Sequence, residues 1–328
     1  MSSLAAEIQR FAGLRVLVIG DVMLDSYIWG TAERVSPEAP VPVVQVRRRD
    51  VRLGGAANVA KNIQALGAMP VLVALAGEDE AGKKLLSILT SANLETRGIV
   101  LSAARPTTVK TRVIASHQHV VRVDDETDRP AAPEEERALI SRLEELLPGC
   151  QVVVFEDYDK GTITPPLIRH AVALARHYNI PTVVDPKKRN FLAYEHVTLL
   201  KPNLKELREG LKVDVRPGNL SEIKEAVSLL KRKLGVAGVL LTLSEHGVLI
   251  DAGDTVTHLP AHVREIADVS GAGDTVVSIA ALGLAIGLAP VAIATLANLG
   301  GGLVCQHMGV VPIDRKELIA EAADIQPV

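Results

Sequence analysis

The stretch Asp268–Thr275 reads Asp-Val-Ser-Gly-Ala-Gly-Asp-Thr and comes directly before a long apolar run. Gly271 and Gly273 lack a Cβ atom, so the backbone can turn tightly and direct N–H groups at a phosphate, with the dipole of a following helix adding positive charge. A carboxylate beside such a turn repels an anion unless it has another task. Asp274 is therefore a candidate base for a hydroxyl that attacks phosphorus. The alternative, which an isolated Gly-x-Gly turn favours, is an Asp that only caps the helix.

The apolar run Val276–Val304 contains no charged residue and is long enough to raise the question of a membrane span. It is rich in Ala and Gly and is interrupted at Gly287–Pro290, so two buried helices explain it better. The first eleven residues lack the basic start and the apolar core of a signal peptide. We therefore expect a cytoplasmic protein that binds no membrane.

Composition narrows the classes of partner. The chain has 328 residues, 48% of them hydrophobic and 2% aromatic, and can bury a large aliphatic core. A formal net charge of −3 gives no overall electrostatic reason to bind nucleic acid, so a small molecule is the expected partner. Cys150 and Cys305 stand far apart without metal-ligand spacing, which suggests buried thiols in a reducing compartment.

Short β-branched apolar runs alternate with helical patterns along the chain and begin near residues 15, 71, 152, 182, 199 and 239. This order predicts an α/β fold, a doubly wound and largely parallel sheet with helices on both faces. Two further β-rich excursions lie near residues 27–50 and 107–123, and the first carries the proline-rich segment Ser36–Val44, which suits an edge strand. In the second excursion, runs at Thr107–Ser116 and His119–Val123 predict a hairpin with Gln118 between them. We expect the excursions to form a small β lid on a single domain over residues 1–328.

Polar residues at strand ends and helix starts are candidate ligand contacts. Asp25 follows the first predicted strand, and the carboxyl ends of strands in a doubly wound sheet face the ligand crevice. It is placed to accept hydrogen bonds from sugar hydroxyls, and a local cap is an equal alternative. Gly54 and Gly55 open a predicted helix that carries Asn58, whose amide both donates and accepts. A packing turn is the default alternative for such a glycine pair.

These motifs together resemble the ribokinase-like (PfkB-type) sugar kinases, in which a Gly-Ala-Gly-Asp turn supplies an anion hole and the catalytic base. The runs Gly20–Asp25 and Ser36–Val44 are most similar to those of the bacterial D-glycero-β-D-manno-heptose-7-phosphate kinases. The resemblance implies a catalytic set made of Gly271, Ala272, Gly273 and Asp274. It also implies that sugar is bound by Asp25, Gly54, Gly55 and Asn58.

A second strand end carries the run Glu-Asp-Tyr-Asp-Lys-Gly at residues 156–161. The related heptose kinases have Ser-Asp-Tyr-x-Lys-Gly there, so Glu156 departs from the pattern. The resemblance carries over substrate binding only to Asp157, Tyr158 and Lys160.

The distal phosphate of a sugar phosphate needs charge-assisted donors. Lys187 belongs to an Asp-Pro-Lys element that is part of the resemblance, and it is the first candidate. Arg122 is the second candidate, since it lies on the predicted lid hairpin together with Lys110 and Arg112. Most surface Lys and Arg side chains are simply solvated, which is the alternative for all of them.

Nucleotide and metal contacts are expected in the second half of the chain. Asn203 and Glu206 have the spacing of a capping box, and the same spacing suits magnesium bound through water, which the resemblance favours. Ser244 and Gly247 resemble the nucleotide-contacting turn of the family. Asn298 lies in an otherwise apolar run, where its amide needs a partner, either adenine or a backbone group.

The resemblance implies an ATP- and Mg²⁺-dependent kinase that phosphorylates the anomeric hydroxyl of D-glycero-β-D-manno-heptose 7-phosphate, in ADP-heptose synthesis for lipopolysaccharide. A monovalent cation such as K⁺ is a further expected cofactor. A homodimer through the lid is also expected, because exposed strand edges need cover. Two alternatives are a ribokinase-like kinase for another sugar phosphate and a non-catalytic sugar sensor, which needs neither a base nor a phosphate cradle.

Overall fold

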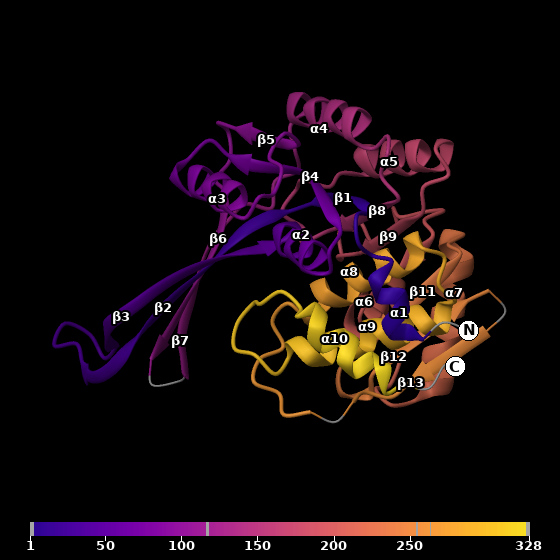
Figure 1. The fold of residues 1–328 in the computed structure, drawn as a ribbon. Coiled ribbons are helices and arrows are strands. Elements are labelled where there is room, and N and C mark those ends of the chain that lie inside the picture. The colour runs from indigo at the N-terminus through magenta and orange to yellow at the C-terminus, as the bar shows by residue number, and fades with distance from the viewer. Residues whose placement is uncertain (1–2, 116–117, 254, 263, 326–328) are drawn as a thin grey trace.

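The computed structural model describes residues 3–115, 118–253, 255–262 and 264–325. Nine strands form the main sheet, in the order β13-β12-β11-β10-β9-β8-β1-β4-β5 (Figure 1). Pairing is parallel from β11 to β5, and β11, β12 and β13 pair antiparallel. The nine strands are β1 (Arg15–Gly20), β4 (Met69–Gly77), β5 (Ile99–Ser102), β8 (Val152–Glu156), β9 (Thr182–Asp185), β10 (Leu199–Leu200), β11 (Gly238–Thr242), β12 (Val248–Ala252) and β13 (Thr255–Leu259).

The predicted doubly wound, largely parallel sheet is confirmed, and all six expected runs are strands of it. Two edge strands were not expected. β5 reads Ile-Val-Leu-Ser and is too short for its apolar residues to mark a strand, and β13 reads Thr-Val-Thr-His-Leu with no buried residue.

Helices cover both faces of the main sheet. On one face of the sheet, α2 and α8 pack in an aliphatic cluster to which α1, α3, α9 and α10 also contribute. On the opposite face, α4, α5, α6 and α7 pack in a second aliphatic cluster. The helices are α1 (Leu4–Gln9), α2 (Ala56–Ala65), α3 (Glu80–Ser91), α4 (Pro133–Leu146), α5 (Pro165–His177), α6 (Leu204–Leu211), α7 (Leu220–Leu234), α8 (Ala272–Ala285), α9 (Pro290–Val304) and α10 (Arg315–Ala323).

The long uncharged run is two helices, α8 and α9, as predicted. They are separated at Gly287, whose φ of +74° suits a residue without a Cβ atom, and both are largely buried. Among the residues that the structure describes, no helix is both long and apolar enough to cross a membrane.

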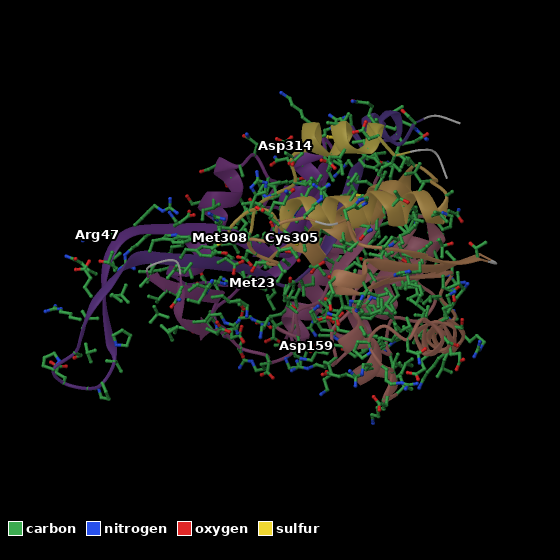
Figure 2. All side chains as sticks on the ribbon, turned by 90° about the horizontal axis from the view of Figure 1, so that it is seen from below. Met23, Arg47, Asp159, Cys305, Met308 and Asp314 are labelled. Carbon is green, nitrogen blue, oxygen red and sulfur yellow. The ribbon has the colours of Figure 1, made fainter. Side chains whose placement is uncertain are left out.

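A second sheet of four strands, the lid sheet, projects from the body as a long arm (Figure 1). In Figure 2 Arg47 lies out along this arm and Met23 lies nearer the body. The proline-rich segment leads into an edge strand, as predicted. In the second excursion Gln118 does not separate the two strands as expected but pairs with Ala115 as the first residue of its own strand. Ser116, the predicted end of the first run, lies outside the described residues. The order is β3-β2-β6-β7, with β2 (Val22–Val35), β3 (Pro42–Gly55), β6 (Thr108–Ala115) and β7 (Gln118–Asp125).

Candidate functional site

Asp274 lies in the first turn of α8, whose N-cap residue is Gly271 with a φ of +84°. The carboxylate is 4% exposed and is held by two side chains from other elements. Asn58 Nδ2 on α2 donates to Oδ2 at 2.6 Å, and Tyr158 Oη donates to Oδ1 at 2.9 Å. The aspartate is therefore directed at neighbouring side chains rather than used as the helix cap.

The environment of Asp274 suits a base. Burial raises the pKa of its carboxyl group to about 6, against the hydrogen bonds from Asn58 and Tyr158, which lower the pKa, and with a further rise from Asp185. A carboxyl group with this pKa is mostly ionised at pH 7 and binds a proton more readily than an exposed aspartate does. Asp274 is thus chemically able to accept a proton at neutral pH.

The strands beneath α8 supply a polar floor. Val154 and Val183 pack in the cluster beneath α2 and α8, and because side chains two residues apart share one face of a strand, Glu156 and Asp185 face the same side. Lys201, just after β10, joins them through an ion pair between its Nζ and Asp185 Oδ2 at 2.9 Å. A Cβ atom on Gly273 would lie 3.6 Å from Lys201 Nζ, so this buried ammonium group adjoins the glycine turn. No motif in the sequence had predicted a role for Lys201.

The loop after β8 is held by Asp21, whose role the sequence motifs did not predict either. Its Oδ2 accepts from the backbone N–H groups of Tyr158 at 2.8 Å and Lys160 at 3.0 Å, and its Oδ1 accepts from Thr162 N at 2.9 Å. Asp21 is 1% exposed, so the three hydrogen bonds are made in the interior. They fix the loop that brings Tyr158 to Asp274.

Asp157, expected to bind substrate, is not brought to this site. It accepts hydrogen bonds from Tyr194 Oη at 2.7 Å and from Asn190 Nδ2 at 3.1 Å, on the opposite face of the sheet from α8. Burial, together with Asp21, raises the pKa of Asp157 to about 6. Successive residues of an extended chain point to opposite faces, which is why Glu156 faces the site and Asp157 does not.

Asp25 was expected in a loop after β1, but it lies on β2 at the base of the lid sheet, where it is buried. Arg112 on β6 forms an ion pair with it. A Cβ atom on Gly54 would overlap the Asp25 carboxylate, so the glycine at this position makes room for it. Asp25 is thus brought together with Gly54, and it has one cationic partner.

The two cations predicted to bind the distal phosphate, Lys187 and Arg122, have carboxylate partners, and so has Lys160, which was predicted to bind substrate. Lys160 Nζ lies 2.6 Å from Glu126, and Lys187 Nζ lies 2.6 Å from Glu206. Arg122 Nε lies 2.9 Å from Asp124, with the Arg122 side chain 58% exposed. A phosphate would have to replace a carboxylate at any of these three.

Asn203 and Glu206 form the capping box of α6. Asn203 Oδ1 accepts from Glu206 N, and Glu206 Oε2 accepts from Asn203 N, both at 2.8 Å. Glu206 Oε1 accepts from Lys187, so both oxygens of this carboxylate already have donors. The described residues contain no group of three or more His, Cys, Asp or Glu side chains arranged to hold a metal.

The residues expected to contact nucleotide lie along the end of β13. A Cβ atom on Gly247, which has a φ of +84°, would overlap the carbonyl oxygen of Leu259, next to the short 3₁₀ turn that contains Ser244. Asn298 Nδ2 donates to the carbonyl oxygen of Pro260 at 2.8 Å, which is the backbone contact that stood as the alternative to adenine. The structure therefore gathers Gly247 and Asn298 around residues 259–260.

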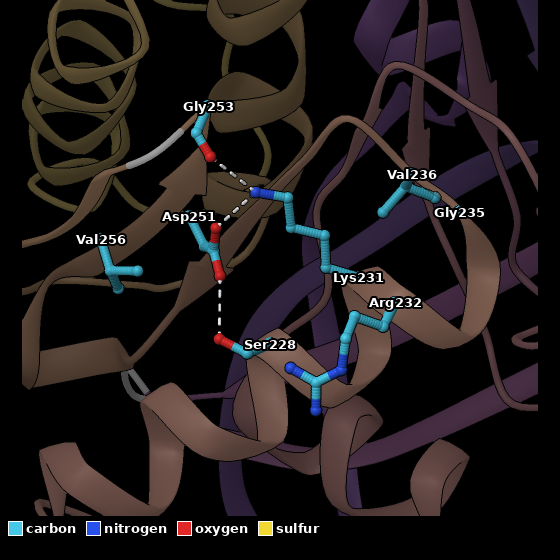
Figure 3. Close-up of a pocket in the computed structure, with 8 residues that line it drawn as sticks. All are labelled: Ser228, Lys231, Arg232, Gly235, Val236, Asp251, Gly253 and Val256. Atoms are coloured by element: carbon cyan, nitrogen blue, oxygen red, sulfur yellow. Dashed lines mark hydrogen bonds and ion pairs between the residues drawn. The ribbon is translucent and has the colours of Figure 1, made fainter.

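A groove of about 520 Å³ lies elsewhere, between α7 and the edge strands (Figure 3). Three of its side chains bind one another: Lys231 Nζ donates to Asp251 at 2.8 Å and Ser228 also donates to Asp251, while Lys231 Nζ donates in addition to the carbonyl oxygen of Gly253 at 3.1 Å. None of the predicted site residues lines it. The candidate chemistry is therefore centred on Asp274 and not on this groove.

The fold is that of the ribokinase-like kinases. The structure of Escherichia coli phosphofructokinase-2 in complex with potassium superposes with a TM-score of 0.77, covering 95% of this chain and 99% of that chain at 19% identity. The structure of Arabidopsis thaliana ribokinase complexed with ribose and ATP superposes with a TM-score of 0.73, covering 96% and 100% at 18% identity. At these identities the likeness concerns the fold.

The family follows from sequence. The model of the pfkB family carbohydrate kinases matches residues 14–316, and the chain belongs to this family. It is 40% identical to the bifunctional protein HldE of Trichlorobacter lovleyi over 95% of its length, and 42% identical to that of Caulobacter vibrioides over 97%. The chain spans 63% of the length of the first of these relatives and 65% of the length of the second.

Proposed function

We propose that this carbohydrate kinase transfers the γ-phosphoryl group of ATP to the anomeric hydroxyl of D-glycero-β-D-manno-heptose 7-phosphate, giving the 1,7-bisphosphate. The observation that carries the chemistry is Asp274, a buried carboxylate at the N-terminus of a helix with a pKa of about 6. The choice of sugar is supported by the motifs at Gly20–Asp25 and Ser36–Val44 and by the similarity to HldE proteins.

In the proposed mechanism Asp274 accepts the proton of the attacking hydroxyl, while Asn58 and Tyr158 hold its two oxygens. The N–H groups at the start of α8 and the neighbouring Lys201 stabilise negative charge on the transferring group. Asp25 and Asn58 orient the sugar. Asn203 and Glu206 would hold Mg²⁺ through water, and the bound ion would supply positive charge that neutralises the phosphates.

The distal phosphate of the sugar is proposed to bind on the lid sheet, at Arg122. Arg122 lies directly opposite Arg112 in the β6–β7 pair, and Arg112 is the partner of Asp25. Residues directly opposite each other share one face of a sheet, so the two guanidinium groups stand beside the proposed sugar position. Lys187 pairs with Asp185 and Glu206, which favours a role at the transferring phosphates over a role at the distal one.

ATP as donor, with Mg²⁺ and K⁺ as cofactors, belongs to this proposal, as does a homodimer through the lid sheet. Support for the dimer comes from the edge strands β3 and β7, whose exposed valines include Val46, Val121 and Val123.

Phosphoryl transfer from ATP to a panel of sugar phosphates tests the proposal. We expect the heptose 7-phosphate to give the highest kcat/KM in the panel. A higher value with another sugar phosphate would transfer the assignment to that sugar, in line with the first alternative. Sugar binding without any phosphoryl transfer would support the sensor and remove the proposed function.

A further inference from the structure

Glu156 and Asp185 stand opposite each other at the carboxyl ends of β8 and β9, where they are partners in the parallel pairing. Glu156 has no exposed surface, and Asp185 is 4% exposed. In the described part of the chain, neither oxygen of Glu156 has a hydrogen-bond partner, and Asp185 Oδ1 has none either. Asp185 Oδ1 is 3.5 Å from Lys187 Nζ, a distance for an ion pair only. Glu156 therefore presents two buried oxygens without donors in the described chain, and Asp185 Oδ1 beside it has only the ion pair with Lys187.

This arrangement is costly unless something binds there. A buried carboxylate without a partner loses its hydration and gains nothing in return. Burial, together with Asp185 and Asp274, raises the pKa of Glu156 well above its usual range, but a proton would satisfy only one of the three oxygens. A cation between the two side chains contacts both carboxylates at once.

The surrounding charge also favours a cation. The cluster combines four carboxyl groups with two ammonium groups, so once a cation displaces the proton of Glu156 the cluster has an excess of two negative charges. A divalent ion balances this excess, whereas a monovalent ion leaves one charge uncompensated. The six residues are Glu156, Asp185, Asp274, Glu206, Lys187 and Lys201.

We propose that Glu156 and Asp185 hold a divalent cation, Mg²⁺ in the working enzyme, below the N-terminus of α8. Mg²⁺ commonly takes one or two carboxylates and completes its shell with water and phosphate oxygens. The proposal rests on the proposed function, because it names direct ligands for the metal of the same site. Glu206, whose two oxygens accept from Lys187 and from Asn203 N, keeps only the contact through water proposed above.

Mn²⁺ binding without nucleotide tests the site, with electron paramagnetic resonance measuring the free ion. We expect the full-length protein to bind Mn²⁺, Mg²⁺ to displace it, and K⁺ at equal ionic strength to leave it bound. Glu156→Gln should raise the Kd for Mn²⁺ at least tenfold, and so should Glu156→Ser. Glu134→Gln, which changes an exposed carboxylate on α4, is the matched control and should bind as the wild type does.

Three outcomes would overturn the proposal: no Mn²⁺ bound by the wild-type protein, an unchanged Kd for Mn²⁺ in Glu156→Gln, or Mn²⁺ binding that is lost in Glu206→Gln and kept in Glu156→Gln. The last would place the cation at the capping box. The sugar-phosphate assay on the wild type is independent, so the proposed function can stand when the metal site fails, and the metal site can stand when another sugar proves to be the substrate.

Thermal unfolding separates metal binding from a packing role. Without metal, Glu156→Gln should raise Tm, because the variant no longer buries an uncompensated carboxylate. Mg²⁺ should raise the Tm of the wild type and not that of the variant, since only the wild type gains binding energy in the folded state. A lower Tm in the variant together with equal Mg²⁺ shifts in both proteins would identify Glu156 as a packing residue and refute the site.

Discussion

At the scale of single residues, the candidate site depends on where water is excluded. Asp274 and Lys201 are both almost fully buried, yet each has polar partners that make the charged form tolerable. A carboxylate held by two donors is fixed in direction, which is what a base requires when it must meet one hydroxyl of a bound sugar. The proposed base therefore depends on the carboxylate of Asp274 itself and on the Tyr158 hydroxyl that holds it.

Asp274→Asn should keep the binding of ATP and sugar and reduce kcat by roughly a hundredfold or more, because an amide cannot accept the proton. Steady-state kinetics with direct binding measurements provide the check. A variant that retains most of its kcat would remove Asp274 from the role of base.

Tyr158→Phe tests the pH dependence. In its proposed role Asp274 must be deprotonated, so kcat/KM of the wild type should fall as the pH drops below about 6, the pKa of Asp274. The Tyr158 hydroxyl stabilises the ionised carboxylate, so its removal raises that pKa and should shift the acidic limb of the profile upward by about one pH unit. A lower plateau with an unmoved limb would show that Tyr158 only supports the loop.

Arg122→Ala should raise KM for the sugar phosphate about tenfold and leave KM for ATP unchanged, because one charge-assisted hydrogen bond to the distal phosphate is lost. Lys187→Ala should instead act mainly on ATP. Arg97→Ala, which removes another exposed and paired arginine, is the control. If both KM values respond equally to Arg122→Ala, the distal phosphate binds elsewhere.

The site residues that could be predicted from the sequence are those within short motifs. Asp274 and Asn58 each stand beside glycines whose spacing implies a turn before a helix, and both reach the site. Asp21 and Lys201 were missed because their roles depend on contacts made across the sheet, and no local pattern encodes those. The pairing of Lys187 with Glu206 was missed for the same reason, whereas Arg122 pairs with Asp124, two residues further along its own strand.

At the scale of elements, the lid sheet is the part whose motion matters. β6 and β7 carry Arg112 and Arg122, so a bound sugar phosphate would be contacted both from the lid sheet and from the body. Water must be kept from the γ-phosphoryl group until the acceptor is present, and closure driven by the sugar would achieve this.

Backbone amides in β6 and β7 should exchange hydrogen more slowly when saturating sugar phosphate is added without ATP. Hydrogen–deuterium exchange resolved by peptide is the measurement, with β11 in the middle of the main sheet as the internal reference. Unchanged protection in Thr108–Ala115 and Gln118–Asp125 under these conditions would refute closure, while the kinase assignment would stand.

Helices and strands with a clear pattern of apolar residues could be predicted from the sequence, and the short edge strands and the start of the lid sheet could not. α8 and α9 were visible in an uncharged run broken by Gly and Pro, and β1 and β8 in β-branched runs closed by polar residues. The lid excursion was predicted only from about residue 27, and the first residues of β2, Val22 to Ser26, were missed because they continue almost directly from β1. The partners of β2 in the lid sheet, which decide that it is a strand, come from β3 and β6.

At the scale of the whole molecule, the lid sheet leaves two strand edges and several valines in contact with solvent. We predict a dimer, measured by light scattering after size exclusion as twice the chain mass of 34.9 kDa. Val121→Glu places a charge on the exposed face of β7 and should give the monomer mass, whereas Leu229→Glu, at an exposed position on α7, should not. A monomeric wild type at micromolar concentration would contradict the prediction.

The pairing of α2 with α8 has a consequence for synthesis of the protein. Asn58 on α2 can form its hydrogen bond with Asp274 only after a further 216 residues have been synthesised. The hydrogen bonds of Asn62 with Thr275 and Ile313 also form only then or later. At translation rates of about 5 to 20 residues per second this delay is about 10 to 40 s. Until α8 is synthesised, the two amides stay in water and the apolar side of α2 that α8 covers in the folded protein is exposed. A nascent chain halted before residue 272 would therefore expose this apolar surface to chaperones, and it would also lack Asp274, the proposed base.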